Sequence, residues 1–310
     1  ENTTGSYNVA VGNGALQLNT IGTSNVAIGS QALSDNTIAV GNIAIGANTM
    51  NYNTTGYSNV AVGQTALYYN TTGAHNTAVG YEALKDNKSH YITGVGYWAL
   101  TNNTTGIYNT AIGYRALMTN TTGNNNTAVG YKALSANTIV NANTAVGYQA
   151  LMTNTIGTLN TAIGKEALYA NTTGAYNTAL GSLSLYTNTT GQYNTAVGYE
   201  SLNLNTIGQQ NTAVGSYALK ANTTGGYTVA VGYNALLNNT TGYDNTAVGY
   251  ESLKTNTIGT KNTGIGHRAL KSNTTGNYNV AVGWWAMAAN TTATQNVSIG
   301  YEALKTNTIG

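Results

Sequence analysis

The side chains that commonly carry enzyme chemistry are few and scattered in this sequence. The three histidines, His75, His90 and His267, lie far apart, and Cys is absent, which excludes disulfides and thiolate zinc sites. No carboxylate pair, no nucleophile beside a base and no phosphate-binding Gly loop recurs at a fixed spacing, although catalysis needs such groups close together. We therefore expect no enzyme activity, no metal site and no cofactor.

The commonest chemical motif is the Asn-x-Ser/Thr acceptor sequence for N-linked sugars. The candidate acceptors are Asn2, Asn53, Asn70, Asn87, Asn103, Asn120, Asn171, Asn188, Asn222, Asn239, Asn273 and Asn290. Sugars on these residues, or on the hydroxyls of the paired Thr residues, would coat one edge of the molecule with glycans. The alternative is a turn of Asn and Thr without sugar, because Asn19, Asn205 and Asn256 occupy equivalent positions where Ile removes the motif.

Aromatic residues recur at fixed places and are candidates for surface contact. Tyr directly follows the string Asn-Thr-Ala-Val-Gly or its variants in nine places, and a Trp pair stands there once. The candidate contact residues are Tyr81, Tyr97, Tyr114, Tyr131, Tyr148, Trp284 and Trp285. Exposed aromatic columns suit sugar stacking or lateral contact between copies, and the alternative is packing of the rings on one another.

All of these residues belong to one tandem repeat. The consensus N-[TV]-A-[VI]-G-Y-x-A-L-x-x-N-T-[TI]-G-x-x occurs 18 times, and its invariant Gly returns every 17 residues except for an interval of 16 between Gly80 and Gly96. Such a unit is shorter than the roughly 30 residues of helical repeats, and Gly and Asn divide it into strand-length pieces. We predict an all-β fold, a parallel β-solenoid (β-roll) with one 17-residue repeat per coil and 18 coils, as a single domain over residues 1–310.

Comparison of the copies predicts where each column of residues lies. The Leu column and the following Asn column hardly vary, and identical Asn side chains at strand spacing can form an amide ladder. The residue two after the invariant Gly varies freely, as in Gln31, Glu82 and Arg115, so we expect it to face solvent. The short repeat should be irregular at residues 87–92 and should absorb the missing residue in a turn, because a slip within a strand would exchange its faces.

The strand itself is restricted at adjacent positions, as in Ala78 and Val79. Neighbours on a strand point to opposite faces, so both faces are expected to be buried, one inside the coil and the other against a second chain. The alternative is that the chain bends at the Gly and both residues line one core.

The charge and hydropathy of the chain limit the classes of partner that we expect. Charged residues make up 6% of the chain, and the net charge is +2, so no attraction to nucleic acid is expected. No apolar run reaches the roughly 20 residues of a membrane span. The chain begins with Glu and shows no polar cap at either end. We therefore interpret it as a processed chain or a segment, whose coils continue into more repeats or stack end to end on another copy.

The strings Asn-Val-Ala-Ile-Gly (25–29), Asn-Thr-Ala-Val-Gly (76–80) and Asn-Thr-Ala-Ile-Gly (109–113) resemble the head repeats of YadA-type trimeric autotransporter adhesins, and also repeats of tail-fibre-type surface proteins. The resemblance implies a parallel β-roll in which three chains pack together. We expect a structural subunit of an extracellular or cell-surface fibre that assembles with itself, end to end or laterally, and carries glycans. Two alternatives stay open: an adhesin head that binds host or matrix surfaces, and an ice-binding solenoid that uses the Thr column after each Asn.

Overall fold

The computed structural model describes residues 2–308 as successive coils, each with one three-residue strand. It comprises two compact units, residues 1–156 and 157–310. The first contains β1 (Val9–Val11), β2 (Val26–Ile28), β3 (Ile43–Ile45), β4 (Val60–Val62), β5 (Thr77–Val79), β6 (Thr93–Val95), β7 (Thr110–Ile112), β8 (Thr127–Val129) and β9 (Thr144–Val146). The second contains β10 (Thr161–Ile163), β11 (Thr178–Leu180), β12 (Thr195–Val197), β13 (Thr212–Val214), β14 (Val229–Val231), β15 (Thr246–Val248), β16 (Thr263–Ile265), β17 (Val280–Val282) and β18 (Val297–Ile299).

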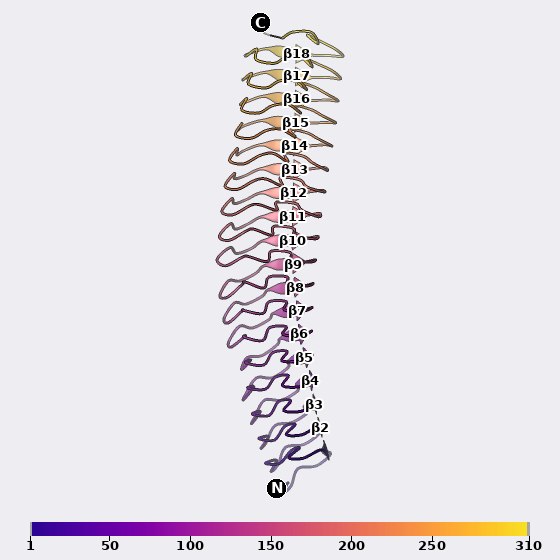
Figure 1. Cartoon of the computed structure of the whole chain (residues 1–310), viewed down its shortest axis with the longest axis vertical. Helices are drawn as coiled ribbons and strands as arrows, with labels where there is room; N and C mark the ends of the chain where they lie inside the picture. Colours follow the sequence, from indigo (N-terminus) through magenta and orange to yellow (C-terminus); the bar gives the residue numbers. More distant parts are fainter. Residues whose placement is uncertain (1, 309–310) are drawn as a thin grey trace. The chain divides into compact units, whose positions relative to one another are not determined.

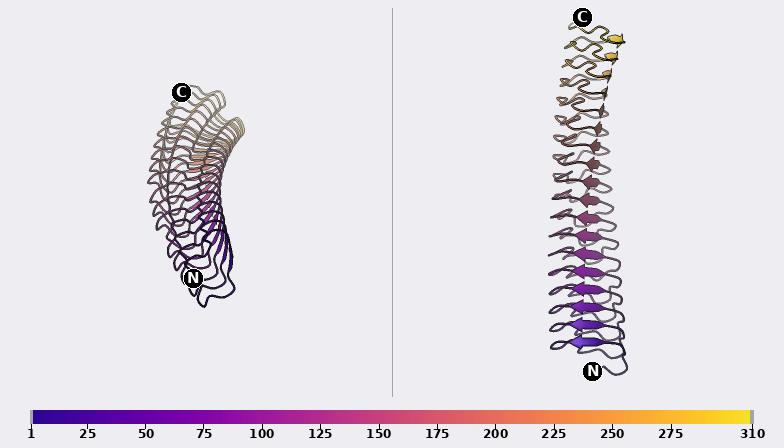
Figure 2. Two further views of the ribbon diagram at one scale, coloured as in Figure 1. Left: turned by 60° about the horizontal axis from the view of Figure 1, so that its bottom comes forward. Right: turned by 90° about the vertical axis from the view of Figure 1, so that its right-hand side faces the viewer.

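Within each unit every strand pairs in parallel with the strand of the next coil (Figures 1 and 2). The register advances by one repeat, as in Val9 opposite Val26 and Thr195 opposite Thr212. Residues 2–308 contain no helix. The predicted parallel β-solenoid with one 17-residue repeat per coil is therefore confirmed, and the same coil is built in both units.

The strand points its middle residue inward and its outer residues toward solvent. In β4, Ala61 is completely buried, whereas Val60 and Val62 are half-buried. The alternative in which Ala and Val line one core is therefore wrong, because the alternation of an extended strand separates them. The first and third residues of the strand, rather than the small Ala, therefore face outward.

Leu fills the rest of the interior from a left-handed backbone conformation. Leu134 is fully buried with a φ of 51°, and such a conformation costs an ordinary residue roughly 1–2 kcal/mol. Burial of the Leu side chain stabilises by about 1.5–3 kcal/mol, which is enough to offset this strain.

The residue two positions after the invariant Gly also adopts a positive φ, as in Arg115 at 55°. This conformation turns the side chain against the neighbouring coil, so the column is mostly half-buried, and Glu251 is only 5% exposed. The prediction that this column faces solvent is therefore wrong.

The predicted amide ladder is present, and it is buried. Asn120 Nδ2 donates to Asn103 Oδ1 at 2.8 Å and to the Gly123 carbonyl at 3.0 Å, while Asn120 Oδ1 accepts from Asn137 Nδ2 at 2.9 Å. Since each amide both donates to one coil and accepts from the next, burial of this polar column leaves few groups unsatisfied.

A second Asn ladder, which the sequence reasoning missed, precedes the strands. Asn194 donates from its backbone N–H to Asn177 Oδ1 at 3.0 Å and from Nδ2 to the Gly208 carbonyl at 2.9 Å. The Gly208 carbonyl also accepts from Asn205 Nδ2 at 3.0 Å. The turn Gly therefore joins the two ladders through a single oxygen.

The turn Gly is required because a side chain there meets the ladder. A Cβ on Gly56 would overlap Asn53 Oδ1 and the Gly73 carbonyl oxygen. Where another residue takes this place, the ladder weakens. The Asn36–Asn53 bond beyond Ala39 lengthens to 3.4 Å, and Asn137 Oδ1 beside Val140 and Asn290 Oδ1 beside Ala293 have no partner.

The short repeat behaves as predicted. Thr77 pairs with Thr93 and Val79 with Val95, so the register of the strands is kept and the missing residue falls in the turn. The missing residue interrupts both ladders. In the first ladder Asn70 Oδ1 has no partner, and in the second Ile92 occupies the position of the Asn. Ile92 still donates its backbone N–H to Asn76 Oδ1 at 3.1 Å.

The buried ladder predicts a large cost for Asn120→Asp. A carboxylate oxygen in place of Nδ2 would face two acceptors, Asn103 Oδ1 and the Gly123 carbonyl, in a buried site. We expect a loss of about 3 kcal/mol or more in the free energy of unfolding, measured by urea titration with circular dichroism. Asn125→Asp, at an exposed position of the next turn, is the matched control and should change little. Equal effects of both variants would contradict the ladder.

The turn Gly predicts an asymmetry between neighbouring coils. Gly56→Ala should destabilise the protein by about 1–3 kcal/mol, because the added Cβ displaces buried hydrogen-bonding groups. Ala39→Gly, the reverse change one coil earlier, should have a much smaller effect, because the gain of a shorter Asn36–Asn53 bond opposes the greater flexibility of Gly. Urea titration of the two variants tests this, and a more stable Gly56→Ala protein would rule the explanation out.

Candidate contact surface

The candidate glycosylation residues lie inside the coils, with one exception. Asn2 is exposed, whereas the other eleven, Asn53, Asn70, Asn87, Asn103, Asn120, Asn171, Asn188, Asn222, Asn239, Asn273 and Asn290, are fully buried. An N-linked sugar attaches to Nδ2, which at Asn188 donates to Asn171 Oδ1 and the Gly191 carbonyl. The geometry therefore argues against sugars at the buried positions, and it supports the alternative of an unmodified turn.

The Thr column after each ladder Asn is also used internally. Thr189 Oγ1 donates to the Thr206 carbonyl at 3.1 Å, and the backbone N–H groups of Thr189, Thr190 and Gly191 approach the same oxygen. These hydroxyls are half-buried, so the column is not the bare hydroxyl array that ice binding would use. The next residue of each turn, Thr or Ile, is the exposed one and forms the turn-tip column.

Aromatic side chains after the invariant Gly form a ladder in each unit. In residues 1–156, Tyr81, Tyr97, Tyr114, Tyr131 and Tyr148 stack with ring centroids 5.1–5.5 Å apart and planes within 18°. In residues 157–310, Tyr233, Tyr250, His267, Trp284 and Tyr301 follow one another at 5.0–5.6 Å. The packing alternative of the sequence analysis is therefore present in the structure.

The stacking decides which part of each ring is available. Tyr97 has neighbours on both faces, and it is still 41% exposed. Its exposed part is therefore the ring edge and the hydroxyl. Because a sugar ring packs on an aromatic face, the inner members of this ladder are poor sugar platforms, but they are suited to contact with another protein surface.

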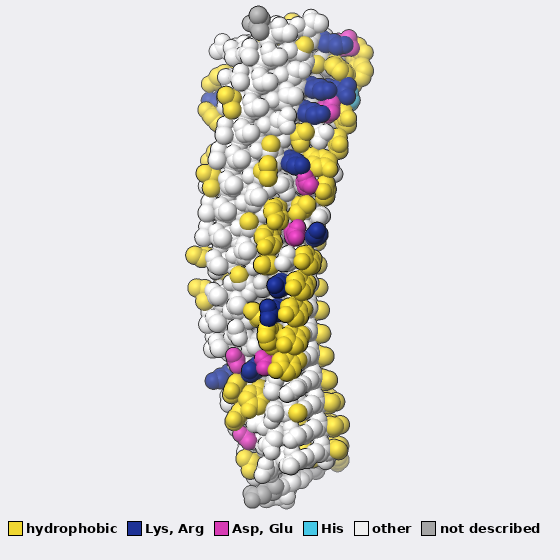
Figure 3. Space-filling model, viewed as in Figure 1, with side chains coloured by type: hydrophobic (Ala, Val, Ile, Leu, Met, Phe, Trp, Pro, Cys, Tyr) yellow, Lys and Arg dark blue, Asp and Glu magenta, His cyan; other side chains and the backbone are white. Residues whose placement is uncertain are grey.

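An aliphatic column runs beside the aromatic ladder. It consists of the third residue of every strand, which is Val, Ile or Leu in all 18 copies. Several members are well exposed, including Ile112 at 41% and Leu180 at 43%. Figure 3 shows hydrophobic side chains gathered in a band on the pictured face, with charged side chains beside them.

The Trp pair has two different environments. Trp284 belongs to the aromatic ladder and is 43% exposed. Trp285 is half-buried and is approached by three cations, with Arg268 Cζ at 4.8 Å, Lys305 Nζ at 5.1 Å and Lys271 Nζ at 5.9 Å from its ring centroid. Of these two candidate contact residues, Trp284 is therefore well exposed and Trp285 is partly covered.

Glu251 anchors two of these cations, Arg268 and Lys271, together with Lys254. Its carboxylate lies 2.7 Å from Lys254 Nζ, 2.8 Å from Arg268 Nε and 3.0 Å from Lys271 Nζ. Burial alone would raise the pKa of this carboxyl, but the hydrogen bonds from Lys254, Lys271 and Arg268 lower the pKa from 4.5 to about 2. The cluster ties two coils of the second unit together and covers one side of Trp285.

The histidines are not brought together. His75 stacks on Tyr91 at 5.2 Å, His90 Nδ1 accepts the Ala74 N–H at 2.9 Å, and His267 lies within the aromatic ladder. Among the described residues no group of three or more His, Asp or Glu could hold a metal ion. Within residues 2–308 the fold also has no long apolar helix able to cross a membrane.

The Glu251 cluster predicts a pH dependence. Since the pKa of Glu251 is lower in the folded than in the unfolded chain, its stabilising effect is full above about pH 4.5 and is lost as the pH falls toward 2. The difference in melting temperature between the native protein and Glu251→Gln should therefore shrink over this range. The more exposed Glu302→Gln is the control. A difference that is constant between pH 6 and 2.5 would contradict this account.

No protein-family model matches the chain, and a search of curated proteins gave no match. A function is therefore inferred from the residues of this chain alone.

Proposed function

We propose that this chain is a structural subunit of an extracellular fibre, in which copies pack side by side along the aliphatic column and the neighbouring aromatic ladder. The alternation of the strand places the aliphatic column outside the coil, so packing of the interior does not account for its composition. Apolar columns of this kind on a surface are typical of interaction sites.

One observation carries the proposal: the third strand residue is exposed or half-buried on the outer face, and yet it is never polar. The first strand residue points to the same face of the strand and is Thr in 11 of the 18 copies, whereas the third is never Thr. Thr is β-branched and suits strands about as well as Val, so strand propensity does not explain this difference. Contact of the third residue with another apolar surface does explain it.

The repeated coil also suits a fibre. Each coil satisfies its polar groups through the next, as the Asn and Thr ladders do, and the aliphatic column extends by one residue with every repeat. A lateral contact therefore grows with the number of coils rather than depending on one patch. The resemblance to YadA-type heads suggests a bundle of three copies as one arrangement of this contact.

Substitution of the aliphatic column tests the proposal. Ile112→Lys, Val129→Lys and Val146→Lys together place three charges on the outer face of β7–β9 and should separate the copies. We expect the native protein to elute well above the monomer mass of 32.1 kDa in chromatography with light scattering, and to form elongated assemblies in electron micrographs. The triple variant should elute near the monomer mass.

The matched control adds the same charge elsewhere in the same coils. Thr105→Lys, Thr122→Lys and Ile139→Lys lie in the exposed turn-tip column and should leave assembly intact. Circular dichroism checks that both variants fold. A native protein that is monomeric at all accessible concentrations, or equal loss of assembly in the two variants, would refute the lateral contact.

A further inference from the structure

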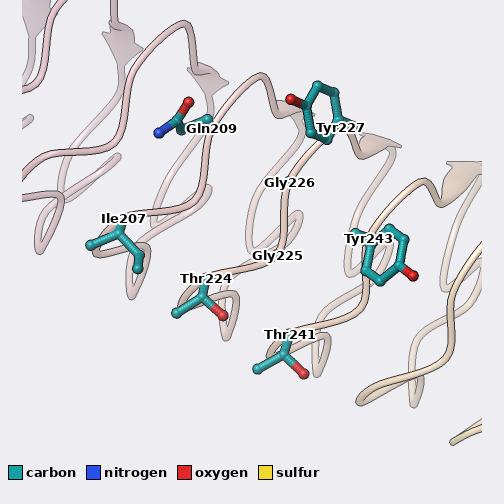
Figure 4. Close-up of a pocket in the computed structure, with 8 residues that line it drawn as sticks. All are labelled: Ile207, Gln209, Thr224, Gly225, Gly226, Tyr227, Thr241 and Tyr243. Carbon is teal, nitrogen blue, oxygen red and sulfur yellow. The ribbon is translucent and has the colours of Figure 1, made fainter.

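The second unit contains a notch where one column of side chains is interrupted. The column is the residue directly after the turn Gly, which is Gln in two successive coils at Gln192 and Gln209, and Tyr at Tyr243. Between Gln209 and Tyr243 the residue is Gly226, which has no side chain. A shallow pocket of about 350 Å³ results, lined by Ile207, Gln209, Thr224, Gly225, Gly226, Tyr227, Thr241 and Tyr243 (Figure 4).

The notch also contains a backbone donor, the N–H of Gln209, for which the next coil supplies no side-chain acceptor. In four other coils, where the next coil carries Asn or His at this column, the N–H donates to that side chain: Thr260 N–H to Asn277 Oδ1 at 2.7 Å, Ile107 N–H to Asn124 Oδ1 at 2.8 Å, Asn124 N–H to Asn141 Oδ1 at 2.7 Å and Ala74 N–H to His90 Nδ1 at 2.9 Å. Gly226 offers no such acceptor to the Gln209 N–H, and a Cβ at residue 226 would lie 2.9 Å from the Gln209 carbonyl oxygen and 3.7 Å from the Gln209 nitrogen. Within residues 2–308 the Gln209 N–H has no partner, as in other coils that Asn or His does not follow at this column, and at the notch it lies beside the pocket.

The two tyrosines beside the notch differ from those of the aromatic ladders. Within residues 2–308 neither Tyr227 nor Tyr243 stacks on another aromatic ring, whereas Tyr193, in the same column as Tyr227, stacks on Tyr176 at 4.8 Å. Tyr227 is 62% exposed and Tyr243 is 47% exposed. Figure 4 places one ring above Gly226 and the other beside it, with Thr224 and Thr241 across the pocket. These rings therefore have faces that a ligand can cover.

We propose that this notch binds a neutral pyranose, such as the terminal sugar of a glycan. A sugar presents an apolar C–H face, which packs on an aromatic ring, and a rim of hydroxyls, which exchange hydrogen bonds with uncharged polar groups. The notch offers both: the rings of Tyr227 and Tyr243, the hydroxyls of Thr224 and Thr241, and the Gln209 N–H. None of the eight lining residues is charged, which selects a neutral ligand. This site does not depend on the assembly of copies.

The test fills the notch with a side chain that the fold already uses. Gly226→Asn should fill the space of the notch with a side chain, after a small shift of the Gln209 carbonyl oxygen, which lies 2.9 Å from the place of the added Cβ. The amide oxygen can then accept from the Gln209 N–H, as Asn277 Oδ1 does from Thr260. The probes are the methyl glycosides of glucose, galactose, mannose and N-acetylglucosamine, titrated in ligand-observed NMR. We expect saturable binding of at least one of them to the native protein, and at least about tenfold weaker binding to Gly226→Asn and to Tyr243→Ala.

Two controls separate the notch from general surface effects. Ala175→Asn adds the same side chain to the same column three coils away, and Tyr193→Ala removes a tyrosine whose ring is stacked. Both should bind the sugar as the native protein does, and circular dichroism should show all four variants folded. The proposal is overturned if none of the four glycosides binds saturably, if Gly226→Asn binds as well as the native protein, or if the controls lose binding equally.

Discussion

The fold depends on the pairing of buried amides between coils. A primary amide that is removed from water without partners costs about 1–3 kcal/mol or more, and this chain buries two Asn columns that run through most of its coils. This cost is avoided only because the Asn amides of successive coils lie directly above one another, so that each coil supplies the donor or acceptor that its neighbour needs. One coil therefore cannot be satisfied alone, and a change in one repeat affects the next, as Val140 and Ala293 show through the unpaired oxygens beside them.

This coupling explains what the sequence could and could not predict. The coil, its register and the first ladder follow from the invariant Gly and Asn and the nearly invariant Leu, because recurrence across copies directly reports the constraints of stacking. The second ladder was missed, although Asn stands before the strand in 16 of the 18 copies, because that Asn was treated as the start of the strand. The repeat at Ile92 shows that the amide there can be lost when the backbone N–H still finds its acceptor.

The wrong expectations, on the exposure of one column and on glycans, depend on backbone conformation, which residue types alone do not reveal. Variation in the second column after the Gly predicts exposure, but these residues have a positive φ, and Arg115 lies over the ring of Trp98 in the preceding coil. Many residue types fit there because contact is made with a stem or ring rather than in a closed core. The Asn-x-Ser/Thr motifs led to a wrong expectation because the motif is local. It has the residues of a glycan acceptor, whereas only the folded coil shows that Nδ2 of the Asn points into a ladder.

Constraint inside the coil and variation outside it have different consequences for function. A single change in an interior column alters two interfaces at once, so new properties arise more easily where a column faces solvent. Gly226 illustrates this: a Gly in one outer column opens a notch, while the nearby ladder bond from Asn222 to the Gly225 carbonyl remains at 2.9 Å. The aliphatic column is the exception, because it faces outward and still does not vary. An outer column in which only apolar residues occur is restricted in the same way as an interior column. A second copy of the chain is the simplest partner that repeats at the same spacing over every coil.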